Sequence, residues 1–591
     1  MTVRRMTELT EELERYLGDP HDDANLMSFK RVLELDEREE FPFELVGELQ
    51  RWRVHEYCLP ERWGGRAGDV EVGFNLLRLV ARRDPTSATA LMLTDLAFMP
   101  AWIAGTEEQR RYFVDAINRG TRMAWGLSER HHGSDVLSNE MRAEKVDGGY
   151  LLTGEKYLIG NATIADVVSV HARTGARGGP GDWSIFAVEK RKAPAGAIVE
   201  LPNERLHGLR ALDMSGIRLD RLFVPDENRL GAEGQGLEIA LKSAQVARTT
   251  ISSMALGAVD TALRVTCDFV VGREIFGQKV ADIPYSRRQL AECFADLALA
   301  DAVSTGAVRG LQGNPAQTSV FSSVVKYFVP TLLERTMAQL SVVLGARLYL
   351  RSHPHYGIYQ KMLRDVLVAI FADGNTVVNL KNIALQLDGI LRAAAETPAD
   401  ARGEAEQRVA TQFDIDAELP EWKPAEQLLF SRGGDETVLA LPTSVKALRA
   451  FADSHPDARQ RDWFHRGADV AELLLAELDR LRAELADLKT TMGRDHASSA
   501  EIFRLAERYS AIHAGAAAVH LVVHSGRVLS DPFPDGAVLL LSLERAWRQV
   551  DPTRPVTDAA VVDRVVEVLL RLHREHRLFS HWQFRLQASG E

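Results

Sequence analysis

The spacing of hydrophobic positions changes twice along the chain and divides it into regions of different expected secondary structure. In 1–121 apolar residues recur at helical intervals, and in 122–236 the period falls to two, with glycine- and proline-rich turns between short segments. In 237–392 the helical period returns over four long stretches, the first of which runs unbroken from 237 to 274. Four long helices with short connections are typical of an up-down bundle. The pattern therefore predicts helices, then a β-domain, then a four-helix bundle.

Beyond the bundle the pattern predicts a linker and one more helical domain. Residues 393–440 are polar, alanine-rich and interrupted by prolines, which favours a linker. From 441 to 591 the helical period resumes, and 470–492 briefly shows a heptad pattern. That stretch is too short for a lasting coiled coil, so we expect a helix that packs on its own domain. The chain is expected to be mainly α with one central β-domain.

Composition excludes several classes of function. The 591 residues suffice for roughly three to five domains, and 46% hydrophobic and 26% charged residues are ordinary globular values. The net charge of −12 argues against a nucleic-acid partner, which would need a basic face. Cys58, Cys267 and Cys293 lack metal-binding spacing and cannot form a disulfide framework, so a reducing cytoplasm is expected. The first residues lack a signal-peptide core, and no run of 18 apolar residues predicts a membrane span.

The segment most typical of a binding site lies in the β-region, at LSERHHGSD (127–135). Its small and hydroxyl-bearing residues let backbone amides approach an anionic or heteroaromatic ligand closely. A hairpin follows at Asp147-Gly148-Gly149, and a further strand ends near Ile159 before the turn Gly160-Asn161. The pair His131-His132 has no third ligand at metal-binding spacing, and no GxGxxG fingerprint follows a strand. Neither a metal site nor a Rossmann nucleotide site is therefore expected.

Loop, hairpin and strand together resemble the flavin-cradling β-domain of the acyl-CoA dehydrogenase family. The family has a Thr/Ser-Glu-Pro-Gly-x-Gly-Ser-Asp loop, then a hairpin, then a Gly-x-Lys-x-Trp-Ile-Thr-Asn strand. The matching residues here are Ser128, Glu129, Gly133, Ser134, Asp135, Gly154, Lys156, Ile159 and Asn161. Further blocks resemble the family on both sides, so the resemblance covers roughly residues 30–392.

The resemblance implies the family's fold. We expect an N-terminal helical domain at 1–121, a β-barrel or sandwich at 122–236 and a four-helix bundle at 237–392. A linker at 393–440 would lead to an additional helical domain at 441–591, like that of the long-chain members.

The resemblance also implies FAD as the cofactor. Ser128 corresponds to a hydroxyl that bonds the isoalloxazine, and Ser134 lies at the pyrophosphate and substrate end of the loop. Arg273 and Phe276 match an Arg-x-x-Phe-Gly motif that reaches a neighbouring subunit's FAD, although by itself Arg273 could equally be a solvated charge at a helix end. The residues expected at the cofactor are Trp125, Leu127, Ser128, Gly133, Ser134, Leu158, Ile159, Gly160, Arg273, Phe276, Gly345 and Asn375. Those expected at the substrate are Ser134, Gln245, Arg248 and Gly374.

Desaturation next to a thioester carbonyl needs a base for the α-proton, and the resemblance implies Asp373. In the family an Arg-Asp pair precedes the Glu-Gly pair that holds the base, and Arg364-Asp365 stands at the same distance before Asp373. Other members carry the base just before an arginine that corresponds to Arg248, where this chain has Ala247. Apolar neighbours are expected to raise the pKa of Asp373. On the local pattern alone, Asp373 could instead cap the helix that follows.

Several positions depart from the family pattern. The Trp and Thr of the family strand are Leu158 and Gly160 here, which removes an aromatic wall and one flavin hydrogen bond. The loop's Pro-Gly is Arg130-His131, the family's Gln-x-x-Gly-Gly is VVLGA at 342–346, and a family Asp is Gln245. Aspartate in place of glutamate at 373 shortens the side chain by about 1.5 Å, and a misplacement of ~1 Å can slow a reaction about 100-fold.

The leading interpretation is FAD-dependent α,β-dehydrogenation of an acyl-CoA or acyl-carrier-protein thioester, as in fatty acid metabolism. Protein side chains contain no hydride acceptor, so the flavin must supply that part. The resemblance implies an electron-transfer flavoprotein as electron acceptor and a homodimer or homotetramer as assembly. The altered base and flavin contacts leave two alternatives open: a reduced-flavin-dependent monooxygenase on the same fold, and a non-catalytic family member.

Overall fold

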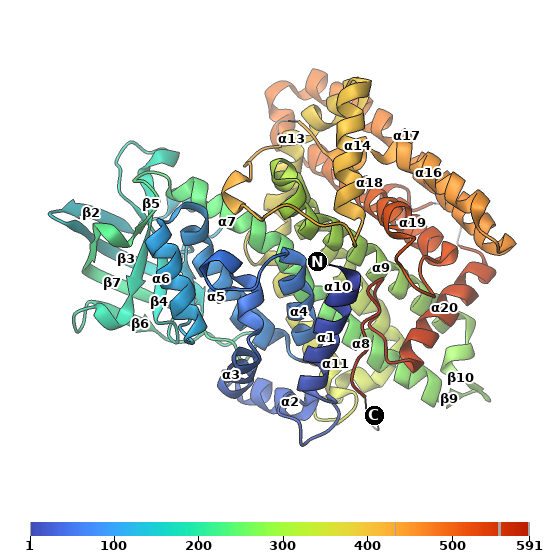
Figure 1. Cartoon of the computed structure of the whole chain (residues 1–591), viewed down its shortest axis with the longest axis horizontal. Helices are drawn as coiled ribbons and strands as arrows, with labels where there is room; N and C mark the ends of the chain where they lie inside the picture. The colour runs from blue at the N-terminus through green and yellow to red at the C-terminus, as the bar shows by residue number, and fades with distance from the viewer. Residues whose placement is uncertain (1, 432, 554–556, 589–591) are drawn as a thin grey trace.

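Helices build both ends of the chain and an eight-stranded sheet lies between them in the computed structural model, which describes residues 2–431, 433–553 and 557–588 (Figure 1). The N-terminal helices are α1 (Val3–Leu17), α2 (Phe29–Arg38), α3 (Phe43–Trp52), α4 (Val70–Arg83), α5 (Pro85–Ala104) and α6 (Glu107–Asn118). The start of α5 is capped, because the Asp84 carboxylate accepts the N–H groups of Thr86 at 3.2 Å and Ser87 at 3.0 Å. By length and composition α5 could cross a membrane, but 72% of its most apolar window is buried inside the protein.

The sheet has eight strands in the order β6-β7-β3-β2-β4-β5-β8, and β1 pairs with β4. The strands are β1 (Met123–Gly126), β2 (Arg142–Val146), β3 (Gly149–Gly160), β4 (Val167–Arg173), β5 (Trp183–Glu189), β6 (Ile198–Leu201), β7 (Met214–Pro225) and β8 (Arg229–Leu230). Along β3 the register shifts twice, and at the second shift Leu158 adopts a left-handed φ of 55°. Such irregularities bend a strand. The end of β3 then lies so close to α5 that a Cβ on Gly160 would be 2.4 Å from Leu93 Cδ1.

The bundle follows the sheet, but its first predicted helix is divided. Its helices are α7 (Gly236–Thr250), α8 (Ser252–Gly272), α9 (Pro284–Gly313), α10 (Thr318–Leu344), α11 (Gly357–Asp365), α12 (Val368–Phe371) and α13 (Thr376–Glu396). The expectation of one unbroken helix from 237 to 274 is wrong, because α7 ends before Ile251. The hydroxyl groups on both sides of Ile251 donate to backbone carbonyls of the preceding turn. Thr250 donates to Val246 O at 3.1 Å, and Ser252 donates to Thr249 O at 2.8 Å. Such bonds compete with the helical ladder and bend helices.

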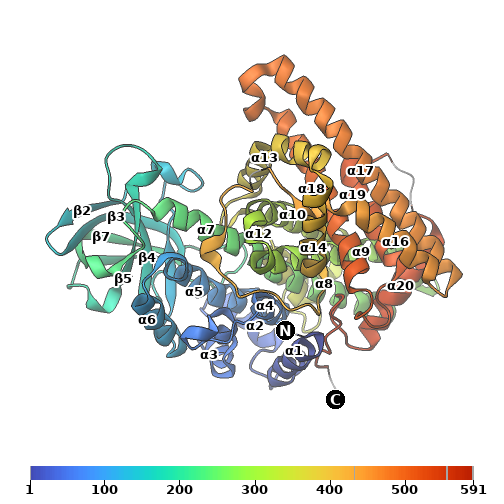
Figure 2. The same ribbon diagram turned by 45° about the horizontal axis from the view of Figure 1, so that its top comes forward.

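The segment 393–440, expected to be a linker, contains helix α14 (Ala399–Phe413). Its polar, alanine-rich composition permits a helix because the few apolar residues, Ala405, Val409 and Phe413, are buried on one side. Six further helices follow: α15 (Glu436–Leu439), α16 (Leu441–Ser454), α17 (Ala458–Met492), α18 (Ala500–Ser525), α19 (Gly536–Val550) and α20 (Ala559–Arg574). Figure 2 shows them gathered against the bundle on the side away from the sheet.

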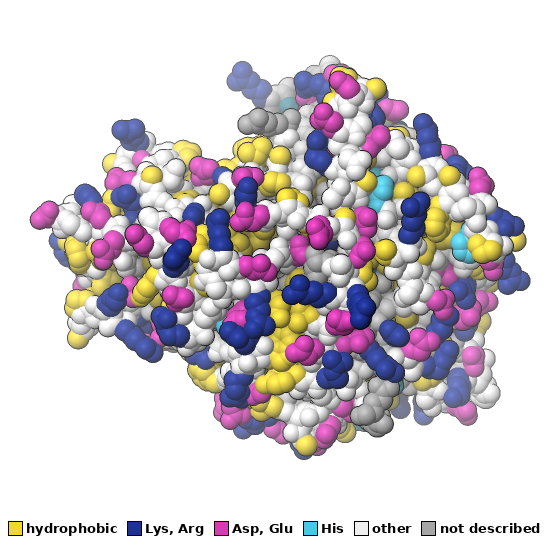
Figure 3. All heavy atoms as spheres, viewed as in Figure 1, with side chains coloured by type: hydrophobic (Ala, Val, Ile, Leu, Met, Phe, Trp, Pro, Cys, Tyr) yellow, Lys and Arg dark blue, Asp and Glu magenta, His cyan; other side chains and the backbone are white. Residues whose placement is uncertain are grey.

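Ion pairs hold the C-terminal helices to the bundle. Arg545 on α19 donates to both carboxylate oxygens of Asp296 on α9, at 2.7 and 2.6 Å, and to Glu292 at 3.1 Å. The two acidic side chains are buried. Over the outer surface, by contrast, acidic and basic side chains are interspersed on the face seen in Figure 3.

The segment after α20 returns to the N-terminal part of the chain. Leu578, Phe579 and Phe584 are fully buried there. The Phe579 N–H donates to Asp260 on α8 at 2.8 Å, and His581 lies 2.9 Å from Asp301, which also pairs with Arg78 on α4 at 2.6 Å. Residues 577–588 therefore complete a buried network that begins in the first helices; below, these residues are called the C-terminal strap.

Candidate active site

A cavity of about 620 Å³ lies where the N-terminal helices, the sheet and the bundle meet. Its walls come from α5, α7, the loop after β1, the end of β3 and the turn between α12 and α13. Trp422, from the segment between α14 and α15, also lines it and meets Trp102 edge to face, with ring centroids 4.5 Å apart. The volume lies within the ~300–1,000 Å³ that is typical of small-molecule sites.

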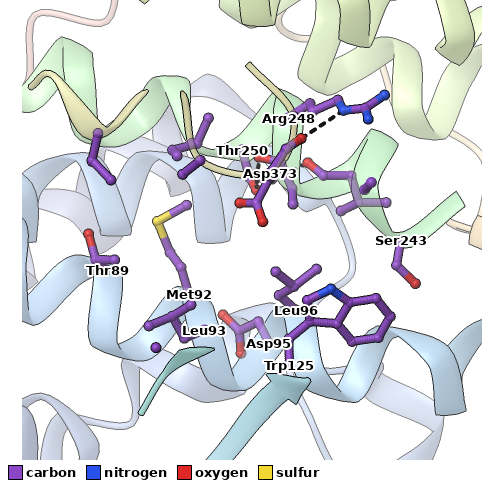
Figure 4. A pocket seen from close by; sticks show the side chains of 18 of the residues that line it. Thr89, Met92, Leu93, Asp95, Leu96, Trp125, Ser243, Arg248, Thr250 and Asp373 are labelled. Carbon is purple, nitrogen blue, oxygen red and sulfur yellow. Dashed lines mark hydrogen bonds between the residues drawn. The ribbon is translucent and has the colours of Figure 1, made fainter. Parts of the chain in front are cut away.

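Asp373 stands in the turn between α12 and α13, and its carboxylate points into this cavity (Figure 4). The turn is tight: Asp373 has φ 54° and Gly374 φ 92°. A side chain at Gly374 would meet Arg248, since its Cβ would lie 2.9 Å from Nη2. The Arg248 Nε instead donates to the Asp373 carbonyl at 2.9 Å and holds the turn against α7. The residue that caps α13 is Asn375, whose side chain accepts the Val378 N–H at 2.9 Å, so the Asp373 carboxylate is left facing the cavity.

Burial raises the pKa of Asp373, and two cations oppose that shift. One is Arg248 and the other is Lys326 on α10, which is fully buried and donates to Ala369 O at 2.7 Å. Burial also lowers the pKa of Lys326 to about 7, with the Asp373 charge acting in the opposite direction. The position at 373 therefore has properties that suit a general base: a carboxylate in a largely apolar cavity, whose proton affinity is set by burial and by neighbouring charges.

The loop after β1 is held by a buried ion pair beneath it. Lys156 on β3 is fully buried and donates to Glu129 at 2.8 Å and to the Leu127 carbonyl at 3.0 Å. The Glu129 carboxylate also accepts the N–H groups of Glu140 at 2.5 Å and Met141 at 3.0 Å. Four bonds thus fix the loop from below while its upper side faces the cavity.

The loop is suited to a flavin. The Ser128 and Ser134 side chains line the cavity, and within the described part of the chain neither hydroxyl bonds another protein group. Gly133 has nothing within 4 Å of where a Cβ would be, and Gly160 is too close to Leu93 for any side chain. Trp125, Leu127, Leu158 and Ile159 add apolar surface to the same wall. Donor hydroxyls beside a flat apolar wall fit a heteroaromatic ring that carries polar edge atoms.

Five of the residues expected at the site do not line this cavity. Gln245 is buried and donates to Leu428 O at 3.0 Å. Arg273 and Phe276 lie in the β9 (Glu274–Ile275) to β10 (Gln278–Lys279) hairpin region, where Phe276 is 94% exposed. Gly345 ends α10, and Asn375 caps α13. Gln245 is therefore not in direct contact with a ligand in this cavity. Arg273 and Phe276 are exposed and available to contact another chain.

Two residues without a local sequence signal also contribute to the site. Trp422 lines the cavity, and Lys326 lies outside its lining but acts on the pKa of Asp373; each reaches the site only through the packing of distant elements. Asp95 had a signal: it is the sole charged residue of α5, in an otherwise apolar sequence. In the structure Asp95 and Cys58 both line the cavity.

Comparison with known families agrees with this geometry. Residues 27–121, 124–222 and 234–387 match, in order, the N-terminal, middle and C-terminal domain models of acyl-CoA dehydrogenases. A Bacillus subtilis (strain 168) protein named acyl-CoA dehydrogenase is 27% identical over 360 residues, which are 60% of this chain and 92% of that one. The caffeyl-CoA reductase-Etf complex subunit CarC of Acetobacterium woodii is 26% identical over 347 residues, 58% of this chain and 89% of its own.

Solved structures show the same fold. Butyryl-CoA dehydrogenase from Megasphaera elsdenii superposes with a TM-score of 0.58 at 23% identity, over 64% of this chain and 96% of that chain. An acyl-CoA dehydrogenase from Bacillus anthracis, solved with FAD, reaches a TM-score of 0.70 at 17% identity and covers 98% of this chain and 95% of its own. That similarity extends through the C-terminal helices. With all three domain models matched in order, the chain belongs to the acyl-CoA dehydrogenase family of FAD-dependent oxidoreductases.

Proposed function

We propose that this enzyme oxidises an acyl thioester between the carbons α and β to its carbonyl, with Asp373 as the base. The observation that carries the proposal is the placement of the Asp373 carboxylate in one cavity with the Ser128 and Ser134 loop. FAD, when bound, supplies the acceptor for the hydride that leaves the β-carbon. The Asp373 carboxylate takes the α-proton, and the apolar walls keep water from the reacting carbons.

Neighbouring groups act through Asp373. Arg248 holds its turn by the bond to the Asp373 carbonyl and adds a positive charge beside the carboxylate. Burial favours the protonated acid, and the charges of Arg248 and Lys326 favour the ionised base. The shorter aspartate is brought to the cavity by the left-handed turn at Asp373-Gly374, which supports its role in place of glutamate.

We propose either CoA or an acyl-carrier protein as the thioester carrier and an electron-transfer flavoprotein as the electron acceptor. Gln245, which replaces a family Asp, does not line the cavity and bonds Leu428 O instead, and this supports a relaxed preference for CoA. The relative CarC is named as part of a reductase-Etf complex, which supports the proposed electron acceptor. A homodimer is proposed because Phe276 and Tyr349 are 94% and 84% exposed.

Anaerobic mixing of the FAD-loaded protein with a panel of acyl-CoA and acyl-carrier-protein thioesters tests the reaction. Bleaching of oxidised flavin is the expected result. Asp373→Asn should slow it by about 10²–10⁴-fold, the contribution usual for a general base, without loss of FAD. Asp388→Asn, on the surface of α13, serves as the control.

Two outcomes would contradict the proposal. Equal rates of flavin reduction in the Asp373→Asn variant and the wild type would remove Asp373 as base. Product formed only with an external flavin reductase and oxygen, with no anaerobic bleaching, would instead identify a monooxygenase.

A further inference from the structure

A carboxylate stands in the cavity wall opposite the base. Asp95 lies on α5 one turn from Met92 and one turn from Met99, and all three line the cavity. Residues at these spacings share one face of a helix, so Asp95 occupies a position that the rest of α5 fills with apolar side chains. Figure 4 shows its carboxylate directed into the same space as that of Asp373, from the other side.

The Asp95 carboxylate has almost no partner within the protein. The thiol of Cys58, from the 3₁₀ turn at Val54–Cys58, bonds to it. Among the residues that the structure describes, no nitrogen or oxygen donor bonds it and no cation pairs with it. The cations on the cavity wall, Arg248 and Arg364, are committed elsewhere, to Asp373 O at 2.9 Å and to Asp36 at 2.6 Å.

An isolated carboxylate in an apolar cavity is costly to the folded protein. Burial raises the pKa of Asp95 to about 7 and places that of Cys58 well above its ordinary value. A hydrophobic residue would fit the position without this penalty, since buried polar groups normally have hydrogen-bond partners. A metal does not supply the missing partner, because the described residues contain no group of three His, Cys, Asp or Glu that could hold one.

We propose that Asp95 binds a hydrogen-bond donor on the acyl group of the substrate, a hydroxyl or a protonated amine, and thereby selects substituted acyl chains over plain hydrocarbon chains. The inference rests on the proposed function, because it places an acyl thioester in this cavity with its α-carbon at Asp373. Cys58 is the one interaction partner of Asp95 among the described residues, so the carboxylate retains capacity to accept a hydrogen bond from a ligand. Asp95 acts as a specificity residue, while the proton of the reaction goes to Asp373.

The test compares matched acyl-CoAs: a series of saturated chains, the same chains with a terminal hydroxyl, and the same chains with a terminal amine. Each is measured in two ways, by anaerobic flavin reduction and by equilibrium binding to the oxidised FAD-loaded enzyme. For one chain length, wild type should prefer a donor-bearing chain to its hydrocarbon counterpart by about 10- to 100-fold, the range of a hydrogen bond to a charged group. Asp95→Leu should reverse the preference in binding and in reduction. Thr89→Val is the control, since the Thr89 hydroxyl bonds Pro85 O at 2.8 Å within its own helix.

Each result either supports or overturns the assignment of Asp95 as a specificity residue. Equal preferences in wild type and Asp95→Leu would overturn the proposal, and so would loss of flavin reduction with every chain in Asp95→Leu, since Asp95 would then be part of the base. Asp95→Asn, which keeps the shape of the side chain, guards against misfolding: it should retain FAD and weaken amine-bearing chains more than hydroxyl-bearing ones. If wild type reduces no flavin with any thioester, the proposed function fails, and the binding preference still tests Asp95 by itself.

Discussion

Replacement of Lys156 by methionine removes the cation that pairs with Glu129 beneath the loop after β1. Lys156 has no exposed surface, and burial lowers its pKa to about 8 against the opposing pull of Glu129. Loss of one member of a buried ion pair typically costs about 3–5 kcal/mol, because the other charge stays buried without its partner. Glu129 keeps the N–H groups of Glu140 and Met141, so the lower end, ~3 kcal/mol, is expected.

The effect should appear in cofactor binding as well as in stability. Lys156 also bonds the Leu127 carbonyl, so its loss frees the loop that carries Ser128. If ordering of this loop is required for FAD to bind, ~3 kcal/mol corresponds to an affinity about 100-fold weaker. Fluorescence of released FAD measures the dissociation constant, and urea unfolding followed by tryptophan fluorescence measures stability.

Lys145→Met is the matched control, because Lys145 on neighbouring β2 is half-exposed and pairs with Asp226 at the surface, where such pairs contribute little. The double variant with Glu129→Gln should lose less than the two single variants together, since both charges of one pair are then removed. If Lys156→Met is as stable and binds FAD as tightly as Lys145→Met, the buried pair does not hold the loop and the reasoning is refuted.

Three further predictions concern the base, the cavity carboxylate and the C-terminal helices. Lys326→Met should raise the pKa of Asp373, so the low-pH limb of anaerobic flavin reduction moves to higher pH; an unchanged limb would remove Lys326 from the electrostatics of the base. Burial raises the pKa of Asp95 from an ordinary 3.8 to about 7. The contribution of Asp95 to the free energy of unfolding is therefore most favourable below pH ~4 and is lost as the pH rises to ~7. Asp95→Asn should therefore gain stability over wild type across that window, by at most ~4 kcal/mol, and a gap that does not widen with pH would contradict this. Arg545→Met leaves two buried carboxylates of α9 with fewer partners and should lower the urea midpoint, whereas exposed Arg482→Met should not.

Local patterns predicted the elements well where apolar spacing alone decides the structure. The hairpin at Gly148-Gly149 follows from turn chemistry, and the two middle helices of the bundle, α9 and α10, follow from periodicity. The break at Ile251 was missed because hydroxyl side chains keep the helical period while they bond backbone carbonyls. Helix α14 was missed because its few buried apolar residues are outnumbered by polar ones, and only its packing partners show which face matters.

The residues of the candidate site also differ in how far the sequence predicts them. Ser128 and Ser134 belong to one short motif and could be named from the sequence, and the structure places both in one cavity with Asp373. In the sequence nothing distinguishes Lys326 from any other lysine in a long helix, and only the fold brings it close enough to Asp373 to interact with its charge. A charged residue in an apolar helix, as at Asp95, is visible in the sequence, but whether it faces water or a cavity depends on elements that are distant in the chain.

The C-terminal strap has a consequence for how the protein is made. Ribosomes release a chain from its N-terminus onward, and domains usually fold as they emerge. Asp260 and Asp301 take partners from the strap, and Glu14 of the first helix accepts the Gln587 N–H at 3.2 Å. These acids can pair with arginines of α4 as soon as those helices pack, but they lack the partners from the strap until α20 has been translated. The first helices are thus among the last parts of the molecule to be completed, and a nascent chain stalled before the strap would leave this network open to the chaperones and proteases of its cell.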